Sequence, residues 1–124
     1  MYVYLPSGSY LKQPLTLRYK AILFGQDRYT TRLVMKGGAT TAMFTGDVDE
    51  LTLTGLGFDG NMDIQVNNVN LFTISVNSAI ITNCLLTDGY DLLNITVNDD
   101  LQLNDVIFRH AVENALVLKG EGIV

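Results

Sequence analysis

The chain contains little of several residue types that usually mark a fold or a site. It has no tryptophan, one cysteine, one histidine and two prolines among 124 residues. The single Cys84 excludes an internal disulfide. No HExxH, GxSxG or clustered-cysteine motif is present, so the common signatures of zinc hydrolases and serine hydrolases are missing. We therefore expect neither a metal site nor a cofactor.

Signals for helices and membrane spans are missing as well. No stretch of a dozen residues combines the i, i+3, i+4, i+7 apolar spacing of a helix with capping residues. No apolar run reaches the ~18 residues of a membrane span, and no basic segment leads into an apolar run as in an export signal. The net charge is −5. We expect no membrane span and no nucleic-acid partner.

Strand-forming residues are abundant instead. Val, Ile and Thr total 31 residues, and apolar residues make up 48% of the chain. Branched side chains suit a pleated surface because their Cβ substituents pack well against neighbouring strands. The length is that of one domain. The composition predicts a single all-β domain over residues 1–124.

Two short patterns alternate along the second half of the chain. The first reads apolar, variable, apolar, Thr or Asn, turn residue, apolar, variable, large apolar, and the second is a run of alternating apolar residues. Their copies begin at Leu51, Leu71, Ala79, Leu92, Leu101 and, partially, Asn114. Two strand motifs that share a period of about 22 residues are typical of a solenoid.

Aligning the repeats predicts which side chains stack about 4.8 Å apart in the core. The predicted columns are Leu51/Ala79/Leu101, Leu53/Ile81/Leu103, Leu56/Cys84/Val106, Phe58/Leu86/Phe108, Phe72/Leu93, Ile74/Ile95/Leu116 and Val76/Val97/Leu118. Cys84 is expected to be a small buried apolar residue, because it occupies an apolar position of the repeat. Asn77 and Asn98 follow equivalent strands and are expected to form a short side-chain ladder.

The opening of the chain carries a resemblance to a known family. Leu-Pro-Ser-Gly-Ser-Tyr from Leu5, followed by Leu23-Phe24-Gly25-Gln26-Asp27-Arg28, resembles the first coils of the pectate-lyase-like right-handed parallel β-helix superfamily. Phe58-Asp59-Gly60-Asn61 is similar to its recurrent coil ending. The resemblance implies a right-handed parallel β-helix of about five to six short coils without internal caps, closest to phage tailspike and appendage proteins. Fold-level resemblance of this kind does not assign a function.

Charge is divided unevenly between the two halves. Residues 1–46 hold six basic residues and one acid, whereas residues 47–124 hold twelve acids and two basic residues. Solvent-exposed loops that are basic in one half and acidic in the other explain this division of charge. The alternative is that the two ends of a rod contact different partners, or each other head to tail.

Candidate catalytic residues follow the third strand of each repeat. The alignment stacks Asp59 with Arg109, and Asp88 with His110. Carboxylates with a histidine and an arginine suit two kinds of reaction. Glycoside hydrolysis needs two carboxyl groups, and lyase chemistry needs a base and a cation. The alternative is that Asp and Gly at these positions are ordinary turn residues.

Candidate binding residues lie beside this set. Arg109, Tyr90 and Asp91 are the predicted ligand contacts, and Tyr19, Tyr29 and Tyr90 are aromatic rings on which a sugar could stack. These positions define a possible polysaccharide groove on the outer surface.

The sequence therefore favours a structural or binding β-helix of a phage virion, as a tailspike, appendage or capsid-associated protein. Its expected partners are other virion chains, with a homotrimer implied by the resemblance, and a surface glycan. The alternatives are a fragment of a polysaccharide lyase or glycoside hydrolase acting on an acidic polysaccharide, and a glycan-binding protein outside the cell.

Overall fold

The computed structural model describes residues 1–120 and is all-β. Its nine strands form one sheet. In chain order they are β1 (Tyr2–Leu5), β2 (Gly8–Lys12), β3 (Leu15–Gly25), β4 (Thr31–Met35), β5 (Phe44–Thr54), β6 (Gly57–Asp59), β7 (Phe72–Thr87), β8 (Asp91–Arg109) and β9 (Asn114–Lys119). One 3₁₀ turn, η1 (Met62–Ile64), lies between β6 and β7. The expected continuation of the repeat to Val124 lies outside the described residues.

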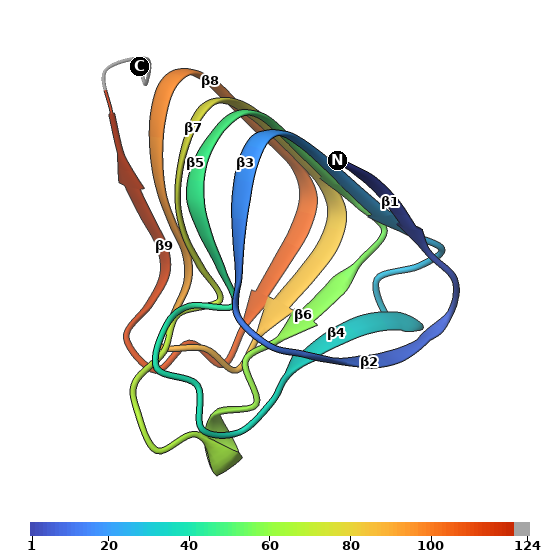
Figure 1. Cartoon of the computed structure of the whole chain (residues 1–124), viewed down its shortest axis with the longest axis vertical. Coiled ribbons are helices and arrows are strands. Elements are labelled where there is room, and N and C mark those ends of the chain that lie inside the picture. Colours follow the sequence, from blue (N-terminus) through green and yellow to red (C-terminus); the bar gives the residue numbers. More distant parts are fainter. Residues whose placement is uncertain (121–124) are drawn as a thin grey trace.

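Every strand pairing is parallel, and the sheet curls until it is nearly closed (Figure 1). β1, β3, β5, β7 and β8 follow one another across it, and β2, β4 and β6 continue onto β7 (Figure 1). Paired residues lie between 20 positions apart, as for Tyr2 and Ile22, and 30 positions apart, as for Lys20 and Glu50. The prediction of an all-β chain is confirmed.

The longest strands bend at residues in the left-handed region. Asn83 and Asp105 have φ of 52° and 55°, and Gly55 at the same corner has φ of 68°. Asn, Asp and Gly tolerate positive φ better than other residues do, so the chain turns there without losing its pairing. β3 also bends at a residue in the left-handed region, Tyr19, which has φ of 57°, and its register with β5 shifts by one residue directly after it.

Three phenylalanines form the centre of the core. Phe44 and Phe72 stack with ring centroids 5.1 Å apart, and Phe58 meets Phe72 edge-on at 5.0 Å. All three side chains are buried. Edge-on and offset aromatic pairs stabilise a core beyond the area that they bury.

Most of the predicted columns are confirmed by the strand register. Leu51, Ala79 and Leu101 are successive partners, and the other predicted columns of β5, β6, β7 and β8 follow in the same way. Leu56 is the exception, because it lies between β5 and β6, and only Cys84 and Val106 of its column are paired. Cys84 is fully buried. The predicted ladder also exists: the Asn98 amide donates to the Asn77 side-chain oxygen at 2.9 Å.

The predicted register of the last strand is wrong by two residues. Leu116 pairs with Leu93 and Leu118 with Ile95, not with Ile95 and Val97. The cause is the carboxylate of Asp91, which accepts hydrogen bonds from both the backbone N–H and the side-chain amide of Asn114, at 3.2 and 3.1 Å. These bonds set Asn114 opposite Asp91 and determine the register of β9.

Within residues 1–120, no helix has the length and apolar character required to cross a lipid bilayer.

Candidate functional site

A groove of about 220 Å³ lies on the outer side of the sheet where β7 and β8 end. It gathers an aromatic ring, two arginines, an acid and the only histidine. Its lining consists of Tyr29, Arg32, Leu85, Thr87, Asp88, Arg109 and His110. Three predicted site residues, Asp88, Arg109 and His110, are therefore brought together.

The strand register explains this convergence. Asp59, Thr87 and Arg109 are successive partners on β6, β7 and β8. One residue further on, Asp88 and His110 both have positive φ, at 56° and 53°. The Asp88 N–H donates to the Arg109 carbonyl at 3.3 Å. Two equivalent turns thus bring an acid and an imidazole, at the ends of neighbouring strands, into the lining of one groove.

The loop between β3 and β4 forms the other wall of the groove. The carbonyl oxygen of Arg28 lies over Gly57, where an added Cβ would overlap it. Only glycine, which has no Cβ, lets this loop lie so close to the sheet at position 57. Beneath it Leu85 points outward yet is buried, and Tyr29 and Arg32 reach the groove.

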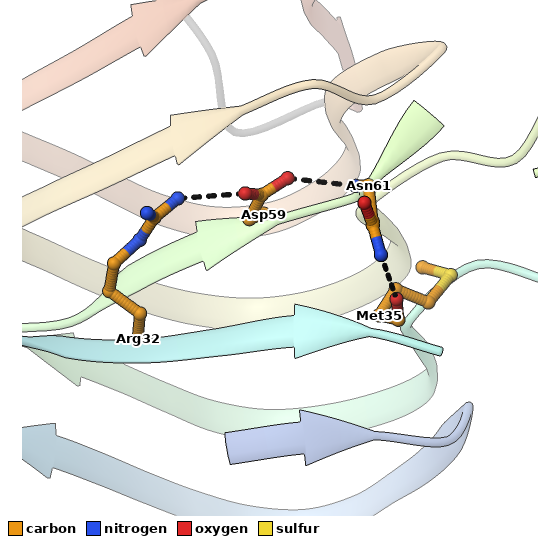
Figure 2. Close-up of polar contacts among 4 residues, drawn as sticks. All are labelled: Arg32, Met35, Asp59 and Asn61. Atoms are coloured by element: carbon orange, nitrogen blue, oxygen red, sulfur yellow. Dashed lines mark hydrogen bonds and ion pairs between the residues drawn. The ribbon is translucent and has the colours of Figure 1, made fainter. Parts of the chain in front are cut away.

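Asp59 does not line the groove, and its carboxylate contacts other residues of the chain instead (Figure 2). Its Oδ2 is 2.8 Å from Nη2 of Arg32, and its Oδ1 accepts the N–H of Asn61 at 2.8 Å. The Asn61 amide in turn donates to the Met35 carbonyl at 3.1 Å (Figure 2). Both oxygens of Asp59 therefore have partners within the chain. The Nε of Arg32 is buried and has no partner among the described residues.

Tyr90 and Asp91 lie outside the lining of the groove. Asp91 is buried and accepts three hydrogen bonds, two from Asn114 and one from Asn94 at 3.4 Å. The Tyr90 backbone bridges two loops, because its N–H donates to Val69 and its carbonyl accepts from Glu113. The geometry gives both residues structural contacts, and their role in ligand binding stays a prediction.

The groove can supply one free carboxylate, one imidazole and one free guanidinium. The ion pairs of the described chain join Lys20 to Glu50, Arg28 to Asp105 and Arg32 to Asp59, so none of them occupies Asp88 or Arg109. Glycoside hydrolysis needs two carboxyl groups that flank the bond, and only Asp88 lines this groove. An imidazole or carboxylate base beside a cation suits proton abstraction better.

Residues 1–120 hold no cluster of three or more His, Cys, Asp or Glu side chains that could bind a metal ion. The groove's polar side chains suit direct contacts with a ligand instead.

Sequence reasoning missed Arg32 as a groove residue, and it did not connect Tyr29 to this groove. Arg32 lies on β4, two strands away from β7 across the sheet, and Tyr29 lies in the loop before β4. Only the alignment of the first strands with the later ones would have placed them. A larger depression of about 470 Å³ was also missed. It lies over β3 and β5 and includes Arg18, Tyr19 and Asp47. Tyr19 is 76% exposed there.

Comparison of the chain with protein-family models, with curated proteins and with solved structures found no match, so the function must be argued from this chain's own geometry.

Proposed function

We propose that this chain is a short right-handed parallel β-helix that serves as a structural and binding element of a multi-chain assembly, of the kind found in phage tailspikes and appendages. The corresponding location is the virion, with an extracellular setting as the alternative. The right-handed sense of the helix follows the general rule that crossovers between parallel strands are right-handed.

The observation that carries this proposal is the repeated register. All eight strand pairings are parallel, and the same inward columns recur from coil to coil. A stack of this kind is a rigid rod whose side chains repeat at regular intervals on its outer faces. Such a rod is suited to presenting surfaces to other molecules.

Polar side chains support the proposal because many of them hold the stack together. The Asn77 amide donates to Asp49 at 3.2 Å and Asn98 donates to Asn77, which links three coils at one corner. Asn70 and Asp91 link neighbouring coils at another corner, where the Asp91 N–H donates to the Asn70 side chain at 2.9 Å. These side chains use their hydrogen-bonding groups to connect neighbouring coils.

The β8 edge offers a contact for a neighbouring chain. Leu101, Leu103, Val106 and Phe108 are only half-buried, although their partners on β7 are fully buried. Among residues 1–120, no strand pairs with stretch 98–109 of β8 on the side away from β7. An unpaired strand edge beside apolar side chains favours pairing with a further strand. We propose that another polypeptide of the assembly pairs there.

Sedimentation velocity over a concentration series tests the assembly function. The purified chain is expected to form species larger than a monomer as concentration rises. The proposal would be ruled out if the chain remained a single monomeric species at every concentration and bound no other chain of the particle from which it comes.

The groove favours a second candidate function, processing of an acidic polysaccharide. This candidate assigns the roles of base and acid to Asp88 and His110, and assigns to Arg109 the role of offsetting the charge of a uronate carboxylate; all three line the groove. Tyr29, 50% exposed, offers a ring for sugar stacking.

Asp88→Asn separates the two candidates. The substitution keeps the size of the side chain and removes its charge, so it is expected to abolish depolymerisation of an acidic polysaccharide and leave assembly unchanged. Absence of activity in the unmodified chain on a panel of acidic polysaccharides would eliminate the enzymatic candidate.

A further inference from the structure

Two adjoining depressions form a groove at one corner of the stack. The first, of about 470 Å³, lies over β3 and β5, and its polar side chains are those of Thr16, Arg18, Tyr19, Asp47 and Asp49. The second, of about 140 Å³, shares Asp47 and Asp49 with it and continues past Ser75 and Asn77 to Asn98. We call the two together the corner groove.

The corner groove runs along the stack, across four strands. β3, β5, β7 and β8 are successive neighbours in the sheet and bend side by side (Figure 1). At ~4.8 Å between neighbouring strands, the four strands span about 14 Å. Within the described part of the chain, no residue lines both this groove and the groove of Asp88 and His110. The two grooves are therefore separate sites.

The backbone of Tyr19 indicates a functional role for this corner. Its φ of 57° lies in the left-handed region, where a bulky side chain is disfavoured. Most of the other non-glycine residues with positive φ are of types that tolerate this region, namely Asn61, Asn83, Asp88 and Asp105. Because Tyr19 is 76% exposed, packing within the chain does not offset the cost. Strained residues of this kind cluster at ligand-binding and active sites.

Polar groups of the corner groove have hydrogen-bonding capacity to spare. Arg18 and Asp47 are partners in the register of β3 and β5, yet the ion pairs of residues 1–120 join other side chains. Asp49 accepts the Asn77 amide with one carboxylate oxygen, at 3.2 Å. Carboxylate, amide and guanidinium groups are planar and can each form two hydrogen bonds side by side. Adjacent hydroxyl groups of a sugar ring are suited to such paired contacts.

We propose that the corner groove binds a linear, uncharged polysaccharide that lies along the stack, with one sugar ring against Tyr19. The exposed tyrosine ring offers an apolar surface for the C–H face of that sugar. The span of about 14 Å is the length of about three sugars of an extended chain, so polar groups on successive strands contact successive sugars. This binding does not depend on the proposed assembly function.

Negative charge around the corner groove selects an uncharged ligand. Asp47 and Asp49 outnumber Arg18 in its lining. Asp99 and Asp100 directly follow Asn98 and are exposed. The negative potential of these carboxylates repels a polyanion. Sugar hydroxyl groups, in contrast, can donate to the carboxylates and accept from the guanidinium.

Affinity electrophoresis of the whole chain tests the ligand class. Native gels contain increasing amounts of galactomannan, xyloglucan or mixed-linkage β-glucan, with polygalacturonate as the acidic comparison. At least one of the three neutral polysaccharides is expected to retard the chain, and the concentration dependence gives a Kd. Migration unaffected by all three would overturn the inference. Retardation by polygalacturonate that requires the Tyr19 ring would overturn the choice of an uncharged ligand.

Substitution of Tyr19 gives the sharpest test, because binding and stability should change in opposite directions. Tyr19→Asn removes the ring and introduces a residue that tolerates positive φ. It is expected to raise Kd at least ~tenfold and to raise the midpoint of thermal unfolding. Tyr19→Phe keeps the ring and should keep most of the affinity. Tyr2→Asn is the matched control, because Tyr2 is 70% exposed and lies outside the groove. An unchanged Kd in Tyr19→Asn would overturn the site.

A pair of substitutions on β7 tests the course of the ligand along the stack. Ser75→Leu fills the smaller depression with an apolar side chain and is expected to raise Kd. Thr73→Leu is the matched control, because Thr73 lies two residues away on the same face of the strand and does not line the groove. It should leave Kd unchanged. Equal affinities of the two variants would confine the ligand to β3 and β5 and overturn its course along the stack.

The outcomes separate this inference from the assembly function. A chain that associates but is not retarded by any of the three neutral polysaccharides would overturn the glycan site and leave the assembly function standing. A chain that stays monomeric and is retarded through Tyr19 would support the glycan site and count against self-assembly.

Discussion

Arg28 is joined to Asp105, which lies 77 residues later in the chain. Its Nη1 donates to the Asp105 backbone carbonyl at 2.8 Å and lies 3.2 Å from the carboxylate Oδ1. The Arg28 side chain is only 14% exposed. The contact links the β3–β4 loop to the bend of β8 and holds this loop over Gly57. One side chain therefore stabilises the wall of the groove.

Arg28→Ala is therefore expected to lower the midpoint of thermal unfolding, because the loop loses its attachment to the β8 corner. Asp105→Asn is the matched variant, because asparagine also tolerates the φ of 55° at this position. It removes the carboxylate but leaves the backbone carbonyl as an acceptor, so its effect on the midpoint is expected to be smaller. Circular dichroism melts measure both. Equal losses would show that the ion pair, and not the backbone bond, dominates.

Gly57→Ala is expected to destabilise the fold by about 1–3 kcal/mol, because a Cβ there overlaps the Arg28 carbonyl, and overpacking forces the backbone to shift. Gly37→Ala is the control. Its added Cβ would lie 3.2 Å from the flexible end of the Ile64 side chain. Urea unfolding of both proteins measures the difference, and equal free energies would contradict the close loop approach.

Phe58→Ala is expected to cost about 3–5 kcal/mol, the range for removing a large aromatic ring from a core. The ring contacts both Phe44 and Phe72, with centroids 5.9 and 5.0 Å away. Ile64→Ala, at a side chain 55% exposed, is expected to change the free energy of unfolding by less than ~0.5 kcal/mol. A small effect of Phe58→Ala would contradict the central position of the aromatic cluster.

Asp91→Asn is expected to destabilise the attachment of β9 by about 1–3 kcal/mol, since an amide nitrogen replaces an oxygen that accepts hydrogen bonds. Hydrogen exchange gives the sharpest measurement. The amides of β9 should lose protection in Asp91→Asn, whereas those of β5 should keep it. Asp88→Asn, in the groove, is the matched substitution and is expected to leave β9 protection unchanged.

Burial raises the pKa of the Cys84 thiol from 9.0 to about 11, because the thiolate is desolvated in the core. The protonated thiol is thus favoured in the folded state, and this stabilisation is complete below pH 9.0 and is lost as pH rises to about 11. The loss amounts to about 2–3 kcal/mol. The difference in unfolding free energy between the native chain and Cys84→Ala should narrow over this window. A constant difference would contradict the shift.

The sequence determined the strands and most of their partners. The apolar alternation and the period of about 22 residues identify Leu51, Ala79 and Leu101 as one column, because each inward position must be apolar when coils stack. Side-chain period and turn residues are local properties, so they can be read from the chain. The ladder of Asn77 and Asn98 follows from the same alignment.

Tertiary structure decided what the alignment could not. The register of β9 depends on Asp91 and Asn114, a polar contact between coils that leaves no mark on apolar periodicity. The groove depends on Tyr29, which reaches it because the β3–β4 loop lies over Gly57 and Arg28 ties that loop to Asp105. Each of these features depends on side chains far apart in sequence, and their positions follow from the packing of the strands.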